Sequence, residues 1–403
     1  MAAPATTGGM GYLLCTVELT EPLPTVRLAP DQNGVGLVLR RHDTPVGFVL
    51  HALAPGAVLC PAAFAALLDG HLGAAATARP PLDPDAAARV PSVAVAVCTR
   101  NRPVRLARCL KSIEALAASA WGRRVGLDIL VVDNAPSDDR ARQVVCDVPG
   151  ARYVHEPKRG LNFARNLALA EAGSEILAYF DDDVVVDHGW LRGLVAAWRE
   201  HPDAAAFTGP VLPYELVTRA QIIFEQWGGF GHRFKRVRWE PAMPGIRYYP
   251  CSPGMIGTGC NMAFRRDELV ALGGFDEALD TGAPLPGGGD LDMLYRVLRG
   301  EYPIITEPEC LVFHQHRRQH RALRFQMWTW GLGFMAFVTK SYRSDPAQRP
   351  LLRRVVVAHF RRAAKNVLTC AIGRGGRPTD QPMSADYSRE NVAPYAMLLC
   401  CRP

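Results

Sequence analysis

Short apolar runs alternate with helix-like segments along the middle of the chain. Four of these runs have the length and composition of buried strands, and they cover residues 93–98, 127–132, 152–154 and 176–180. Between them, residues 103–116 and 161–172 repeat apolar positions every three or four residues, as helices do, and Pro103 begins the first of these segments. Strands that alternate with helices predict an α/β fold with a parallel sheet that has helices on both faces.

Different patterns flank this region on each side. The first residues predict a small α+β module with a hairpin turn at residues 42–45, and a stretch rich in Ala and Pro predicts a linker after it. A second helical pattern follows the α/β region. The predicted parts are the N-terminal module at 1–72, the linker at 73–92, the main domain at 93–345 and a helical C-terminal extension at 346–403.

Three consecutive acids follow the fourth apolar run. Asp181, Asp182 and Asp183 cannot all enter a core, so they must lie where the strand leaves the sheet. Side chains alternate along an extended chain, so we expect Asp181 and Asp183 on one side and Asp182 on the other. Two neighbouring carboxylates repel unless a cation lies between them, which favours Mg²⁺ or Mn²⁺ with open positions for phosphate. An acidic turn that caps a helix beginning near His188 explains the same residues without a metal.

Polar residues also follow two other predicted strands. Thr99 follows the first, Asp133 follows the second, and Asp181 follows the fourth. Parallel sheets bind ligands at the carboxyl ends of their strands. The sequence therefore predicts that these three residues share one edge of the sheet and form a site.

Composition limits the classes of function. The chain has 403 residues, of which 48% are hydrophobic and 21% charged, as in ordinary globular proteins. The net charge of +7 is mild and the basic residues form no dense stripe, which argues against a nucleic-acid partner. Eleven cysteines occur without a CxxC pair, and neither a signal peptide nor a transmembrane helix is evident. We therefore expect reduced thiols and a cytoplasmic location.

Seven motifs then occur in a fixed order between residues 92 and 340. They read VAVAVCTRNRP, ILVVDNAPSDD, KRGLNFARNLAL, AYFDDD, GTGCNMAFRR, GGFDE and GGGDLDMLYRV. In order and spacing they resemble the inverting nucleotide-sugar transferases of glycosyltransferase family 2. The resemblance implies a GT-A fold, with a mostly parallel sheet flanked by helices. It also implies transfer of a sugar from a nucleoside-diphosphate sugar to a hydroxyl acceptor.

The resemblance assigns roles to the residues on the donor side. It makes Asp183 a direct metal ligand and lets Asp181 contact ribose or metal, so Mn²⁺ or Mg²⁺ is the implied cofactor. Asp133 matches the residue that accepts a hydrogen bond from the base, with Thr99 in the same pocket. A carboxylate can accept hydrogen bonds from either uracil or guanine, so Asp133 does not distinguish between these bases. Arg165 suits a contact with phosphate or a base edge, and a solvated helix arginine explains it equally well.

A helix that follows residues 287–289 carries the candidate base. By position Asp290 matches the carboxylate that removes the proton from the acceptor hydroxyl, and we expect Asp292 beside the donor sugar and acceptor. A helix N-terminus lowers a carboxylate's pKa, so a base there needs compensating burial. Both acids serve equally well as helix caps. Family members commonly have Glu-Asp where this chain has Gly289 and Asp290.

Other motif residues are expected to border the sugar and the metal. Gly259 and Asn261 match the loop beside the donor sugar, where a glycine permits close approach. His314 and His316 follow an apparent strand at 311–313, and we predict His316 as a third metal ligand. Exposed polar histidines are the alternative.

The C-terminal extension adds a basic helix at residues 351–370. Its apolar residues fall on one helical face and its arginines mostly on the other. This pattern suits peripheral contact with the inner face of an anionic membrane, but it is more typical of a helix packed on the core with a solvated face. Membrane contact would fit a lipid-linked acceptor.

The predicted function is an inverting, metal-dependent glycosyltransferase of a polysaccharide, glycolipid or natural-product pathway. A nucleotidyltransferase is the alternative enzyme, and it usually has a glycine-rich loop where this chain has CTRNRP. A sugar-nucleotide-binding protein with a decayed site is the alternative outside enzymes. The retention of Asp133, Asp181, Asp183 and Asp290 together argues against decay.

Overall fold

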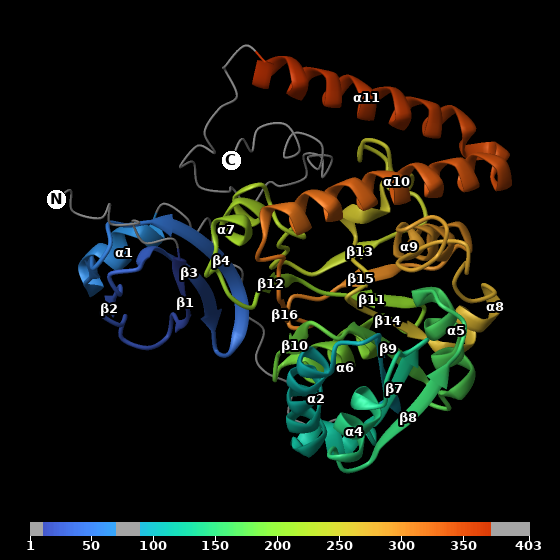
Figure 1. Ribbon diagram of the computed structural model, residues 1–403, viewed down its shortest axis with the longest axis horizontal. Coiled ribbons are helices and arrows are strands. Elements are labelled where there is room, and N and C mark those ends of the chain that lie inside the picture. The colour runs from blue at the N-terminus through green and yellow to red at the C-terminus, as the bar shows by residue number, and fades with distance from the viewer. Residues whose placement is uncertain (1–10, 70–88, 372–403) are drawn as a thin grey trace.

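A large mixed sheet forms the centre of the protein in the computed structural model, which describes residues 11–69 and 89–371 (Figure 1). Its strands, in spatial order, are β13 (Val237–Trp239), β15 (Ile304–Thr306), β11 (Ala206–Thr208), β14 (Asn261–Arg265), β9 (Ile176–Asp181), β6 (Val93–Thr99), β7 (Asp128–Asn134) and β8 (Ala151–Glu156). Strands β9, β6, β7 and β8 are parallel, and β14 runs antiparallel to β9 and β11. The prediction of a mostly parallel α/β sheet is confirmed.

Helices pack on both faces of this sheet because its central strands are apolar on both sides. Val93, Val95 and Val97 of β6 lie in one core, and Ala94 and Ala96 lie in the other. The first core contains α2 (Pro103–Ala118), α3 (Ala120–Val125), α4 (Arg140–Cys146) and α6 (Trp190–Glu200). The second contains α5 (Leu161–Glu171), α8 (Arg266–Ala271) and α9 (Gly289–Arg299). Continuous apolar strands therefore mark a sheet buried on both faces.

A second, smaller sheet lies beside the acidic segment. It consists of β10 (Val184–Val186), β16 (Val312–His314) and β12 (Val211–Pro213), in that order. Val184 pairs with His314, so this sheet joins the chain just after Asp183 to the first predicted histidine. The sequence did not separate this sheet from the large one, because β9 and β10 read as one interrupted apolar run.

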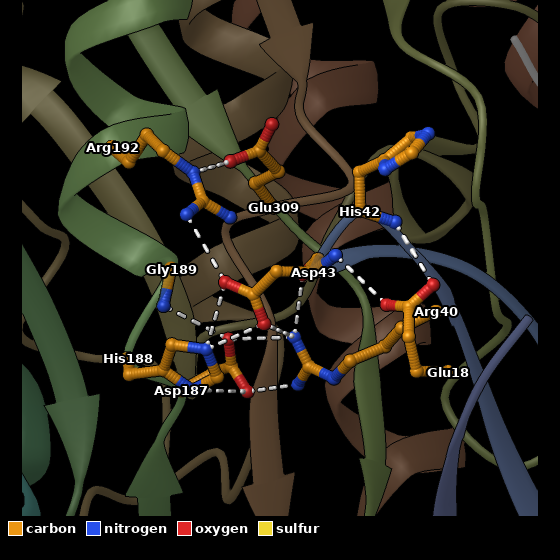
Figure 2. Close-up of polar contacts among 9 residues, drawn as sticks. All are labelled: Glu18, Arg40, His42, Asp43, Asp187, His188, Gly189, Arg192 and Glu309. Atoms are coloured by element: carbon orange, nitrogen blue, oxygen red, sulfur yellow. Dashed lines mark hydrogen bonds and ion pairs between the residues drawn. The ribbon is translucent and has the colours of Figure 1, made fainter. Parts of the chain in front are cut away.

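The N-terminal module has its own sheet and core. It contains β1 (Gly11–Glu18), β2 (Val26–Arg27), β3 (Gln32–Arg41), β4 (Thr44–Ala52), β5 (Val58–Leu59) and α1 (Pro61–Asp69). The predicted hairpin turn lies at His42 and Asp43, both with positive φ. Arg40 forms a buried ion pair with Asp187 of the main domain, and Asp43 bonds His188 and Arg192 (Figure 2). Most of the predicted linker, residues 70–88, lies outside the described residues.

Two long helices follow the main domain. They are α10 (His320–Ser344) and α11 (Arg349–Ala371), joined by η2 (Pro346–Gln348), and Figure 1 shows them stacked at one end of the molecule. The predicted apolar face of α11 divides in two: Leu352 is buried against α10, whereas Phe360 is 57% exposed. The remaining elements are α7 (Arg219–Gln226) and η1 (Pro253–Met255). Over residues 11–69 and 89–371, none of the helices is long and apolar enough to cross a bilayer.

Candidate functional site

The carboxyl ends of three adjacent strands meet at one edge of the large sheet. Thr99 of β6 is in register with Asp133 of β7, and Cys98 is in register with Asp181 of β9. The three polar residues predicted to share this edge are therefore brought together by the sheet register. Parallel α/β sheets bind ligands at this edge, so it is the candidate functional site.

The acidic segment turns away from the sheet immediately after β9. Asp182 accepts a hydrogen bond of 2.8 Å from the Thr99 hydroxyl and one of 3.0 Å from Arg102. Arg102 also lies 3.6 Å from the carboxylate of Asp183. One guanidinium thus contacts both acids, so the expected separation of Asp182 from Asp183 is not observed. Alternation stops at Asp181 because the next two residues form a turn.

The charges around Asp181 and Asp183 differ. Burial and the neighbouring Asp183 raise the pKa of Asp181 to about 6. Burial alone would also raise the pKa of Asp183, but His314, Arg317 and Arg102 hold it well below its usual range. Arg105 donates a hydrogen bond of 3.1 Å to Asp183 as well. Asp183 is therefore an ionised carboxylate surrounded by cations. Asp181 is a carboxylate that lacks a cation in direct contact within the described part of the chain.

Asp133 presents an unused acceptor at the end of β7. The residue is buried, and Tyr153 donates a hydrogen bond of 3.0 Å to its Oδ2 atom. No described residue bonds its buried Oδ1 atom. Burial raises the pKa of this carboxyl, which the Tyr153 hydrogen bond partly offsets. An unpaired buried acceptor is costly, so Oδ1 fits a donor that a ligand supplies, such as a base N–H.

Asp290 lies in the first turn of α9 rather than at its cap. The cap is Gly288, whose φ of 86° favours glycine. The backbone N–H groups of Gly259 and Leu291 each donate a hydrogen bond of 2.8 Å to the Asp290 carboxylate. Burial and the charge of Asp280 raise the pKa of Asp290, although Arg165 opposes the shift. The burial that a base at a helix N-terminus requires is therefore present.

Arg165 is a buried ion-pair partner instead of a solvated arginine. It lies 2.7 Å from Asp280 and also bonds the Asn162 side chain and the Gly259 carbonyl. The charges of Asp280, Asp181 and Asp290, in that order, offset the burial of its guanidinium. The charges of Asp181 and Asp290 therefore both act on Arg165, whose direct hydrogen-bond partners are other protein groups.

Two residues predicted to border the donor sugar serve the protein's own packing. A Cβ atom at Gly259 would lie 2.6 Å from Arg165 Nη2, so the glycine makes room for that side chain. Asn261 is buried; its amide donates to the carbonyls of Pro210 and Cys310, and its oxygen accepts from Trp190. The expected sugar contact of Asn261 is corrected, because every polar atom of this side chain is already bonded.

Asp292 points to α10. Its carboxylate lies 2.9 Å from Arg296 and 2.8 Å from Lys340, and the residue is buried. The contact with Lys340 ties α9 to α10, whereas the contact with Arg296 lies within α9. The structure therefore does not bring Asp292 to the position beside sugar and acceptor that the sequence suggested.

The two predicted histidines are adjacent, but their roles are exchanged. His314 Nε2 lies 3.2 Å from Asp183 Oδ1. His316 Nε2 lies 2.6 Å from the buried Glu225, and the Nδ1 atoms of the two histidines are 3.0 Å apart. Both ring nitrogens of His316 are engaged away from Asp183, so the choice of His316 as metal ligand is corrected. His314 is the histidine at the acidic segment.

The sequence reasoning missed four residues around the site. Arg102, Arg105 and Arg317 surround Asp183 within 3.6 Å, and Tyr153 bonds Asp133. Arg102 and Arg105 lie on either side of Pro103 and are three residues apart, so they share one face of the predicted helix. This spacing could have been detected in the sequence beside the predicted site. Arg317 follows the histidine pair, and its position depends on β16. Tyr153 was part of a predicted strand without an assigned role.

The acidic segment fits a metal that binds together with phosphate. Among the described residues, no three His, Cys, Asp or Glu side chains form a group that could hold a metal ion. Mg²⁺ commonly binds through one or two carboxylates plus substrate phosphates, however. The Asp181 side chain accepts no hydrogen bond from the described residues, and repulsion from Asp183 helps to raise its pKa. Asp181 and Asp183 therefore fit the two carboxylates that a metal shares with substrate phosphates.

A GT-A-like α/β sheet that carries acids and a buried hydrogen-bond acceptor atom at its carboxyl edge is typical of enzymes that bind nucleotide sugars. The chain belongs to glycosyltransferase family 2: the model of "Glycosyl transferase family 2" matches residues 94–270. The succinoglycan biosynthesis protein ExoM of Rhizobium meliloti is 35% identical over 238 residues, which are 57% of this chain and 68% of that protein. The family resemblance inferred from the motifs is confirmed.

Two further similarities bear on the fold and on the extent of the match. The glucosyl-dolichyl phosphate glucuronosyltransferase of Haloferax volcanii is 24% identical over 193 residues, which are 46% of this chain and 56% of that protein. The chain thus spans little more than half of this relative. The mannosyltransferase PcManGT from Pyrobaculum calidifontis, solved with GDP-Man and Mn²⁺, superposes with a TM-score of 0.50 at 22% identity, covering 74% of this chain and 79% of its own. That likeness shows the fold.

Proposed function

We propose that the protein is an inverting, metal-dependent glycosyltransferase that moves a sugar from a nucleoside-diphosphate sugar to a hydroxyl acceptor. The observation that carries this proposal is the position of Arg165. Its buried guanidinium interacts with the charges of both Asp181 and Asp290. A metal-side carboxylate and a candidate base therefore lie within electrostatic reach of one side chain, as transfer between a bound donor and an acceptor requires.

The donor nucleotide is proposed to bind along the ends of β6, β7 and β9. Asp133 Oδ1 accepts a base N–H, which accounts for its missing partner. The diphosphate lies toward Asp181 and Asp183, with Arg102, Arg105 and Arg317 placed to contact its oxygens once they release the acids. A bound Mn²⁺ or Mg²⁺ neutralises the charge that develops on the departing diphosphate. The Mn²⁺ bound to the mannosyltransferase above supports the choice of a divalent metal.

Asp290 is the proposed base. As the acceptor oxygen attacks the anomeric carbon from the face opposite the leaving group, the Asp290 carboxylate takes its proton. The sugar–phosphate bond breaks, and the nucleoside diphosphate leaves with the bonding electron pair. The raised pKa of Asp290 makes it a stronger base than an exposed aspartate. The two N–H groups that bond it fix its orientation.

For the acceptor we propose a lipid-linked alcohol presented at the inner face of a membrane. The turn that leads to Asp290 packs on α10: a Cβ atom at Gly288 would lie 2.4 Å from the carbonyl oxygen of Gly333. The proposed base thus lies two residues after a glycine that packs on α10, and α10 in turn contacts α11, which contains residues 351–370 with their predicted membrane contact. The dolichyl phosphate in the name of the Haloferax volcanii relative agrees with this class of acceptor.

A panel of UDP- and GDP-sugars tests the proposal. Purified protein is incubated with each donor and Mn²⁺, Mg²⁺ or EDTA, and slow donor hydrolysis is followed. We expect metal-dependent release of nucleoside diphosphate, lost in Asp183→Ala and kept in the control Asp203→Ala, whose exposed carboxylate pairs with Arg238 far along the chain. Release of pyrophosphate would identify a nucleotidyltransferase, and activity that survives Asp183→Ala would contradict the metal site.

A further inference from the structure

The helical hairpin of α10 and α11 concentrates positive charge. Residues 320–371 contain ten Lys and Arg side chains and one acid, Asp345. This acid is already bonded to Tyr295 and Arg299 of α9. Since the whole chain has a net charge of +7, the remainder of the protein is slightly acidic. The hairpin is therefore a distinct basic region on an otherwise nearly neutral protein.

Large apolar side chains are exposed on the same two helices. On α10, Phe325, Trp328 and Leu332 are 63%, 47% and 39% exposed, and their spacing puts them on one face. On α11, the exposed residues are Val357, Phe360 and Leu368, again on one face. Half of the exposed large hydrophobic residues in the described part of the chain lie on this hairpin. Scattered exposed apolar residues are ordinary, but a stripe along a helix is not.

Arginines accompany both stripes. Arg321 and Arg324 flank Phe325 on α10, and Arg354 and Arg361 lie near the stripe of α11; all four are exposed. None of these four arginines forms an ion pair with any residue in 11–69 or 89–371. Basic and apolar side chains on one solvent-facing surface are typical of helices that lie in the headgroup region of an anionic bilayer.

We infer that the solvent faces of α10 and α11 dock on an anionic lipid surface. A second copy of the chain is a poor occupant, because a symmetric contact would bring two strongly basic hairpins together. Residues 372–403 are a poor occupant by charge, since they contain four basic and three acidic residues. An anionic bilayer complements both the charge and the apolar stripes.

The position of α10 connects this surface to the site. One face of the helix touches the turn before Asp290 through Gly333, and Lys340 bonds Asp292. On the same helix, the side chains of Phe325 and Trp328 are exposed to solvent. This inference deepens the proposed function, on which it rests only for the claim that the docked surface presents the acceptor. Lipid binding itself requires neither donor nor acceptor.

Vesicle sedimentation without donor tests the inference. We expect the full-length protein to bind phosphatidylcholine vesicles that contain phosphatidylglycerol and not to bind vesicles of pure phosphatidylcholine. High salt should release the protein from the anionic vesicles. Arg321→Glu/Arg324→Glu should weaken binding at least about 30-fold, since each lost charge near an anionic surface costs roughly fivefold. Phe325→Ser/Trp328→Ser should weaken it at least about tenfold.

Matched controls change similar residues elsewhere. Lys111→Glu/Arg199→Glu makes the same charge change on α2 and α6, and Val58→Ser/Val270→Ser removes two apolar residues that are 47% and 49% exposed. Both controls should bind vesicles as the unmodified protein does, and all variants should melt with one cooperative transition.

Three results would overturn the inference. The first is equal binding by the hairpin variants and the controls, or equal binding to both kinds of vesicle. The second is a dimer in sedimentation velocity that Phe325→Ser/Trp328→Ser dissociates, which would make a second copy the occupant. The third is faster proteolysis within residues 372–403 of that variant without lipid, which would make the chain's own terminus the occupant. Donor hydrolysis measured in parallel separates these results from failure of the proposed function.

Discussion

The proposed donor side and the proposed acceptor side of the site are built in different ways. On the donor side, Thr99, Asp133 and Asp181 follow successive parallel strands, and the register of the sheet alone brings them together. On the acceptor side, Asp290, Gly259 and Arg165 come from two helices and a loop. They are held by hydrogen bonds between residues that are far apart in sequence.

The two sides also differ in how their acids are stabilised. On the proposed donor side, His314, Arg317 and Arg102 lower the pKa of Asp183, and Arg105 also contacts this carboxylate. The acceptor-side Asp290 is bonded by two backbone N–H groups and has its pKa raised by burial and Asp280. These differences fit the proposed roles, in which one side holds charge and the other accepts a proton.

Asp290→Asn should abolish transfer and keep donor binding. General-base catalysis contributes roughly 10²–10⁴-fold to rate, so kcat should fall by a factor of that order. The proposed nucleotide contacts lie on the other side of the site, so the dissociation constant of the nucleoside diphosphate, measured by calorimetry, should stay within about twofold.

Asp292→Asn is the matched control for this prediction. It makes the same change two residues away on the same helix, where the carboxylate bonds Arg296 and Lys340. Breaking these buried contacts should lower the melting temperature but leave the kcat of the folded fraction nearly unchanged. Equal losses of kcat in both variants would show that Asp290 acts through helix stability and not as a base.

The same division explains how much the sequence could predict. The apolar runs predict where the strands end, and the proposed donor side consists of residues at these strand ends. The shared position of Thr99, Asp133 and Asp181 at one edge of the sheet could therefore be predicted from the pattern alone. The partners of Asn261, Asp292 and His316 come from distant segments, which no local pattern specifies. Gly259 was recognised as a position of close approach, and the structure shows that Arg165 is a group that approaches it. The partners of these side chains are therefore determined by long-range hydrogen bonds, which residue spacing does not specify.

Asp133→Asn should weaken binding of nucleoside diphosphates about 10- to 100-fold, the range expected for a hydrogen bond to a charged group. Titration calorimetry with UDP and GDP measures the effect. Asp128→Asn, at the opposite end of β7 and bonded to Arg152, is the control and should leave both affinities unchanged. Tyr153→Phe should fall between the two, because Asp133 keeps its charge but loses one partner. Unchanged affinity for nucleoside diphosphates in Asp133→Asn would contradict the proposed contact between Asp133 and the nucleotide base.

His314→Gln should weaken Mn²⁺ dependence about tenfold while largely keeping the fold, because its imidazole touches only one acid of the donor side. His316→Gln should act in the opposite way. It leaves the buried Glu225 without one of its two histidine partners, so the melting temperature should fall more than the apparent Mn²⁺ affinity. Titrations of activity with Mn²⁺ and thermal melts in EDTA separate the two effects. The reverse pattern would restore His316 as the metal-side histidine.

The smallest effect is expected at the hairpin turn of the N-terminal module, beside the donor side. Glu18 accepts hydrogen bonds from the backbone N–H groups of His42 and Asp43 (Figure 2). Burial alone would raise its pKa, but these bonds and the Thr20 hydroxyl lower it to about 2.

Because the folded pKa is depressed, the Glu18 carboxylate stabilises the protein above the unfolded pKa of about 4.5, and this contribution is lost as the pH falls toward 2. Glu18 is partly exposed, so solvent screening reduces the gain to about 0.5–1 kcal/mol at neutral pH. Glu18→Gln should therefore lower the melting temperature by about 1–3 °C at pH 7 and by less at pH 4, whereas Glu21→Gln should change neither. The turn reaches Asp187 rather than the strand ends, so the KM for the donor should stay constant. A donor KM raised as much as in Asp133→Asn would mean that the N-terminal module, and not the sheet register alone, sets the geometry of the donor side.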